Sequence, residues 1–104
     1  MEIQNALSNE NKIFVKMDLV VGVNDKDLRV IFRIPCENMK EKRKIMENMA
    51  AIRHEMLMSY DDSLNKQSIE ERDFQKIKSN CLAVLNKYAS VDVDKVYVEF
   101  FAHN

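Results

Sequence analysis

Apolar residues recur at every second position in two neighbouring stretches near the start of the chain. The first stretch has its apolar positions at Ile13, Val15, Met17, Leu19, Val21 and Val23. In the second, Leu28, Val30, Phe32 and Ile34 alternate with Arg29, Ile31 and Arg33. Period-two alternation predicts strands with one buried face. The turn-forming run 24–27 joins them, so we predict a β-hairpin that ends at Pro35, which lacks a backbone N–H.

The spacing of apolar residues changes to a helical period after position 37. One stripe contains Ile45, Met49, Ile52, Met56 and Tyr60. It predicts an amphipathic helix that stops at 61–63, followed by a loop over 61–67. Ser68 and Glu71 have the spacing of a capping box, so we predict that a second helix begins there. Its apolar stripe is Phe74, Ile77, Cys81, Val84, Leu85 and Tyr88.

A third alternating stretch closes the chain, with apolar residues at Val96, Val98, Phe100 and Ala102. The predicted order is therefore β-β-α-α-β. Each amphipathic helix needs an apolar surface to cover. We predict an α+β domain over 13–104, in which two helices pack on one face of a three-stranded sheet. Residues 1–12 are rich in Asn and Gln and are predicted to be a linker or flexible lead-in.

Composition narrows the classes of function. The 104 residues are 46% apolar and 32% charged, which is typical of one globular domain. The net charge of −1 does not favour nucleic acid over any other class of partner. The single glycine argues against phosphate-cradling loops. Cys36 and Cys81 lack CxxC spacing, and we predict that both are small buried hydrophobic residues.

No motif predicts catalysis, a cofactor or a metal. His54 falls on the polar face of the first helix and His103 is the penultimate residue, so both are expected to be solvated. The acidic residues nearest to a hard-cation set are Asp61, Asp62, Asp92 and Asp94. They lack the alternating oxygen ligands of a calcium loop.

Two basic features leave alternatives open. The run Lys40 to Lys44 reads either as a solvated face or as a contact for an anionic partner or lipid headgroups. Arg53 falls inside the apolar arc of the first helix. Its stem could lie on apolar surface while its head reaches water, or it could pair with a carboxylate across a subunit boundary.

The face of the sheet that the helices leave open is the most informative feature. It is predicted to carry Val20, Ile31, Tyr97 and Phe101 among the charged residues Lys16, Arg29, Arg33 and Glu99. An open face should be polar throughout. The apolar residues either mark a contact with a partner or form cross-strand pairs that only stabilise the sheet. The candidate interface is Val20, Ile31, Arg53, Tyr97 and Phe101.

Several stretches resemble the C-terminal domain of the flagellar basal-body protein family FliL. They are IRHEMLMSY at 52–60, KIK and VLNK at 76–78 and 84–87, and VDKVYVEFF at 93–101. The resemblance covers residues 13–103. It implies a stomatin-like fold and a non-enzymatic protein that forms rings of identical subunits, associates with flagellar stator proteins and lies on the periplasmic face of the bacterial inner membrane. The family has no catalytic residues.

The sequence departs from that family in two respects. It contains no N-terminal transmembrane helix, which a longer protein would supply upstream, and it has no glycine before the second helix, where 68–71 stand instead. If Met1 is the native start, we expect a cytoplasmic module that binds a small ligand or a protein. A small enzyme with an unrecognised site is the third hypothesis.

Overall fold

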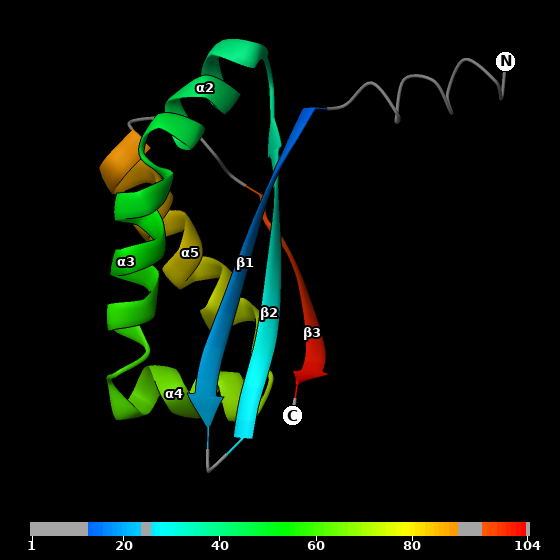
Figure 1. Ribbon diagram of the computed structural model, residues 1–104, viewed down its shortest axis with the longest axis vertical. Helices are drawn as coiled ribbons and strands as arrows, with labels where there is room; N and C mark the ends of the chain where they lie inside the picture. The colour runs from blue at the N-terminus through cyan, green and yellow to red at the C-terminus, as the bar shows by residue number, and fades with distance from the viewer. Residues whose placement is uncertain (1–12, 24–25, 90–94, 104) are drawn as a thin grey trace, which may run out of the picture.

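The computed structural model describes residues 13–23, 26–89 and 95–103, and it contains a three-stranded antiparallel sheet (Figure 1). Strand β1 (Ile13–Val23) pairs with β2 (Lys26–Cys36) along its whole length. Strand β3 (Tyr97–His103) pairs with the other side of β2, from Arg33 opposite Tyr97 to Asp27 opposite His103. The order β1-β2-β3 leaves β1 and β3 as the two edge strands.

The described helices lie between β2 and β3 in the chain and on the same side of the sheet (Figure 1). They are α2 (Met39–Glu47), α3 (Met49–Ser59), α4 (Ser63–Glu70) and α5 (Phe74–Ala89). The predicted α+β class and the one-sided sheet are confirmed. The helical region, however, is divided into four helices where the sequence patterns predicted two.

Asn48 divides the first predicted helix into α2 and α3. Its side-chain amide donates to the Lys44 carbonyl at 2.8 Å, and its backbone N–H is shared among carbonyls of the last turn of α2. Asn competes for backbone hydrogen bonds in this way, which disfavours it inside helices. The apolar stripe continues across the break, so Ile45, Ile52 and Met56 all reach the core.

The predicted loop at 61–67 is wrong, because α4 begins at Ser63. The Asp62 carboxylate is the N-cap and accepts a hydrogen bond from the Leu64 N–H at 2.9 Å. Ser68, predicted to cap the second helix, instead lies buried inside α4, and its hydroxyl donates to the Leu64 carbonyl at 3.1 Å.

The turn between α4 and α5 takes the place of the expected glycine. Arg72 has φ of 53°, in the left-handed region. The Arg72 N–H donates to the Ile69 carbonyl and the Asp73 N–H to the Ser68 carbonyl, which is the Schellman pattern of a helix end. Asp73 then accepts from the Lys76 N–H at 3.3 Å and starts α5.

The core lies between the sheet and the helices. Its fully buried members include Met17, Leu19, Phe32, Ile34, Ile45, Ile52, Met56, Ile69, Ile77 and Leu85. Cys36 and Cys81 are both buried, as predicted. Burial raises the pKa of the Cys81 thiol to about 12, so neither its position nor its ionisation suits a nucleophile.

Candidate interaction surface

The side of the sheet away from the helices carries three complete cross-strand rows of residues, with Phe14 beyond them on β1. We call the following residues the open sheet face: Phe14, Lys16, Asp18, Val20, Arg29, Ile31, Arg33, Tyr97, Glu99 and Phe101. The register sets Val20, Arg29 and Phe101 in one row. The next row is Asp18, Ile31 and Glu99, and the one after it is Lys16, Arg33 and Tyr97.

Three of the four predicted apolar residues of this face are exposed, and the fourth is not. Val20 is 48% exposed, Tyr97 45% and Phe101 43%. Ile31, by contrast, is only 4% exposed and is not available to a partner. It lies in the middle of the central strand, directly between Asp18 and Glu99, and longer side chains on the neighbouring positions enclose it. Phe14, 38% exposed, completes the apolar set that the sequence analysis left incomplete.

The charged residues of the face form two ion pairs that run diagonally between strands. The Arg29 guanidinium donates from Nε to both carboxylate oxygens of Asp18 at 3.0 Å. The Arg33 Nε donates to Glu99 Oε1 at 2.6 Å. The hydrogen bond from Arg29 lowers the pKa of Asp18, against the effect of desolvation. Exposed pairs of this kind stabilise a fold little, but they leave Lys16 as the one charged residue of the face without an ion pair among the described residues.

Arg53 lies on α3, on the helix side of the sheet, and is not part of the open sheet face. Its side chain is exposed, as expected if its stem lies on apolar surface and its head reaches water, and it forms no ion pair within the described part of the chain. It is near enough to Asp18 to contribute to the lowered pKa of that carboxyl. Arg53 is therefore a free cation beside one end of an existing pair.

A shallow hollow of about 690 Å³ continues from the open sheet face around the outer edge of β3. Its lining combines Phe14, Arg33, Tyr97 and Glu99 with Val98 and with Phe74 and Lys78 from α5. Phe74 packs edge-to-face on Phe100 at 5.3 Å between ring centroids, and the Arg72 guanidinium lies 5.6 Å from the Phe100 centroid. Sequence periodicity placed Phe74 in the apolar stripe; it lies at the start of α5 and, although it contacts Phe100, is 43% exposed.

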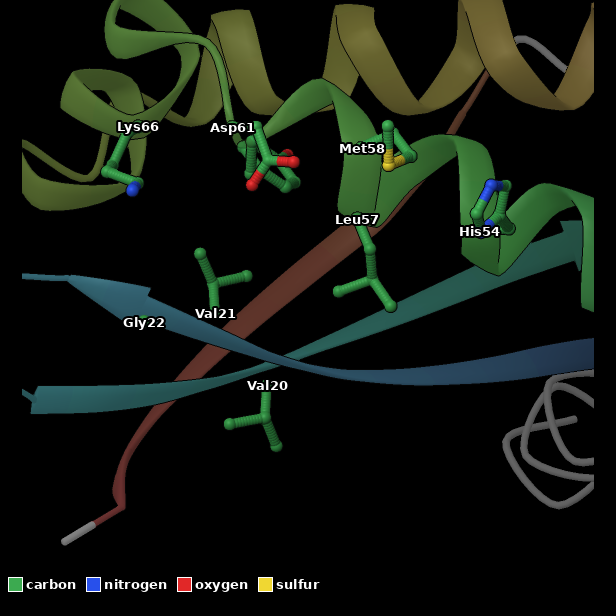
Figure 2. Close-up of a pocket in the computed structure, with 9 residues that line it drawn as sticks. Val20, Val21, Gly22, His54, Leu57, Met58, Asp61 and Lys66 are labelled. Carbon is green, nitrogen blue, oxygen red and sulfur yellow. The ribbon is translucent and has the colours of Figure 1, made fainter.

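A second hollow, of about 360 Å³, lies between α3 and the outer edge of β1 (Figure 2). We call it the β1 groove. Its lining residues are Val20, Val21, Gly22, His54, Leu57, Met58, Tyr60, Asp61 and Lys66. Figure 2 shows Leu57 pointing from α3 towards the strand, with Val21 on the helix side and Val20 on the opposite side. The sequence analysis did not find this groove, because it depends on how far α3 stands from the strand.

The polar candidates from the sequence are dispersed. Asp62 caps α4, and Asp92 and Asp94 lie outside the described residues, as does the predicted lead-in 1–12. In the described ranges, no three His, Cys, Asp or Glu side chains cluster as a metal site would require. In the basic run, Lys40, Arg43 and Lys44 are exposed along α2. No helix among the described residues has both the length and the apolar character needed to cross a bilayer.

Tyr60 is the one buried side chain with an unsatisfied polar atom among the described residues. Its hydroxyl has no hydrogen-bond partner, although it lines the β1 groove. Burial raises the pKa of Tyr60 to about 12, and the neighbouring Asn80 side chain offsets part of the rise. A phenol that stays protonated at neutral pH and lacks a partner is not placed as an acid–base catalyst.

Comparisons with protein families, with curated proteins and with solved structures found no match to this chain.

Proposed function

We propose that this chain is a non-enzymatic interaction domain that associates with copies of itself through the open sheet face. The observation that carries the proposal is the set of exposed apolar side chains there. Val20, Tyr97 and Phe101 remain uncovered, while four of the five charged residues among them are already paired. Burying such a surface against another copy removes apolar area from water. Lys16 is the one charged residue of the face without an ion pair among the described residues, and a second copy must leave it solvated or pair it.

The resemblance to the FliL family supports a role in a flagellar basal body. The three stretches that carry it fall in α3, in α5 and at β3, and the hairpin precedes them as that family's element order requires. On this proposal the domain forms a ring of identical subunits, supports the stator units of the motor and lies on the periplasmic side of the inner membrane.

A second candidate function is a stand-alone binding module, and the β1 groove favours it. The groove has an apolar floor from Val21 and Leu57 and polar groups at its rim, including His54 and Lys66. Ligand sites have this combination of apolar lining and a few polar groups. Under this alternative, the protein stays monomeric and Leu57→Glu abolishes ligand binding.

Sedimentation velocity over rising protein concentration tests self-association. We expect the sedimentation coefficient of the wild type to increase with concentration. Phe101→Glu places a charge in the centre of the contact and should weaken association by about tenfold or more. Met39→Glu is the matched control, since Met39 is also an exposed apolar residue but lies on α2. A wild type that remains monomeric at millimolar concentration, or equal weakening by both variants, would contradict the proposal.

A further inference from the structure

The outer edge of β1 has no partner for its backbone groups within the described residues. Pro35 lacks an N–H and stands opposite Phe14, so this pair must be of the type that exchanges no hydrogen bonds. The two types alternate along an antiparallel ladder. Lys16, Asp18 and Val20 therefore also turn their N–H and C=O groups away from β2, towards the free edge.

That edge is accessible where it borders the β1 groove. Gly22 is classed as exposed, and because it has no side chain, its exposed surface is backbone. No hydrogen bond joins the described helices to the backbone of β1. An open strand edge of this length is a template for pairing with another strand.

The outward-facing residues of β1 form a self-complementary series. In order they are Phe14, Lys16, Asp18 and Val20: apolar, positive, negative, apolar. If a second β1 is laid antiparallel about a two-fold axis at Met17, Lys16 of each copy stands opposite Asp18 of the other. In the same register, Phe14 of each copy stands opposite Val20 of the other.

The neighbouring registers are less favourable. An axis at Asp18 sets two aspartates against each other, and an axis at Lys16 does the same with two lysines; like charges directly opposite destabilise a ladder. If the register shifted by a single residue, residues whose N–H and C=O groups point to the free edge would stand opposite residues whose groups point to β2. The side chains of the added strand would also lie on the opposite faces of the sheet. Of these registers, only the axis at Met17 sets opposite charges against each other while outward backbone groups face outward ones.

We propose that a second copy of this chain pairs with β1 in this register, so that two three-stranded sheets become one continuous sheet. The inference rests on the proposed self-association but assigns it a second, two-fold contact distinct from the face around Phe101. The strand start of the second copy lies against Val20 to Gly22, where its Ile13 enters the β1 groove.

Complementary charge reversals test the register. Lys16→Glu leaves two negative positions on the strand, and Asp18→Lys leaves two positive ones. Each variant alone should dimerise about tenfold more weakly than the wild type, because both symmetry-related pairs become repulsive. An equimolar mixture of the two variants restores attraction at both pairs and should regain wild-type affinity. Lys76→Glu, an exposed reversal on α5, is the control and should leave dimerisation unchanged.

Disulfide trapping provides a measurement that does not depend on those charges. Lys16→Cys mixed with Asp18→Cys should form a mixed disulfide under oxidation, because directly opposite residues lie about 5.5 Å apart at Cα. Either variant alone should not, because residues 16 and 16 of two copies lie diagonally, beyond disulfide reach. Cys36 and Cys81 are buried and do not compete.

The outcomes separate this contact from the one on the open sheet face. We expect each charge-reversal variant alone to dimerise more weakly and their mixture to regain wild-type affinity. We also expect the mixed disulfide to form. Association that Phe101→Glu weakens but Lys16→Glu leaves intact overturns the strand pairing and retains the proposed function. If Lys16→Glu dissociates the dimer and Phe101→Glu does not affect it, the strand pairing is retained. Association through the open sheet face is then overturned. The register is also overturned if the mixture of Lys16→Glu and Asp18→Lys dimerises no more tightly than either variant alone.

Discussion

At the scale of single residues, the packed side of the sheet and its open side obey different rules. On the packed side, the alternation of apolar residues decides burial, and Met17, Leu19 and Phe32 are fully buried as their positions predicted. On the open side, burial depends on neighbours in other strands. Ile31 is enclosed by the residues flanking it, whereas Val20 on the edge strand remains exposed.

The buried hydroxyl of Tyr60 leads to a pH-dependent stability. The folded chain raises the pKa of Tyr60 to about 12, above its ordinary value of 10.0, so the folded state holds this proton more tightly than the unfolded chain does. The resulting stabilisation is complete below pH 10 and is lost as pH rises to 12. We expect the free energy of unfolding to fall there by up to about 1.4 kcal/mol per pH unit from this group. Cys81 adds a similar loss that begins near pH 9.

Tyr60→Phe should remove the part of the high-pH decrease in the free energy of unfolding that comes from Tyr60. Urea unfolding at pH 7, 9 and 11 measures this free energy. At pH 7 the variant should be no less stable than the wild type, because it deletes a buried hydroxyl that has no partner. Tyr88→Phe is the control: the Tyr88 hydroxyl donates to Glu55 at 3.0 Å, so its loss costs about 1 kcal/mol. Loss of stability in Tyr60→Phe at pH 7 as large as in Tyr88→Phe would contradict this account.

At the scale of elements, strands were more predictable than helix ends. Period-two alternation located all three strands, because each has one face in the core. The helix ends depend on which polar side chain captures a free N–H. Asp62, Ser63 and Ser68 all have capping side chains, and sequence alone does not say which is used. The pattern also could not show that Arg72 adopts the left-handed conformation usually taken by glycine.

The position of the α4 start can be tested by substitution. Asp62→Ala removes the N-cap of α4 and should lower the free energy of unfolding by about 1 kcal/mol. Ser68→Ala should change it much less, because a serine inside a helix that bonds to the carbonyl four residues earlier adds little. Urea unfolding of the two variants compares them directly. A larger loss from Ser68→Ala would restore Ser68 as the helix cap.

At the scale of the whole molecule, the described residues form a sheet with one face free of helices and with β1 and β3 as its edge strands (Figure 1). Four helices cover the other face, so the hydrophobic core is complete without a partner. The candidate face was predictable because the alternation of residues in β1, β2 and β3 assigns side chains to faces. The ion pairs on this face were not predictable, because strand register decides which charged residues meet. The pairs are Asp18 with Arg29 and Glu99 with Arg33. The β1 groove depends on the packing of α3, which periodicity does not specify.

Hydrogen–deuterium exchange at low and high protein concentration tests self-association through the sheet most directly. Amide protection follows hydrogen bonding and burial, and β1 has outward N–H groups that a second strand would engage. We predict slower exchange at high concentration in peptides from 13–23 and from 97–103, with no change in α2. Equal exchange in the sheet peptides at every concentration, or protection confined to α2, would contradict an assembly built on this sheet.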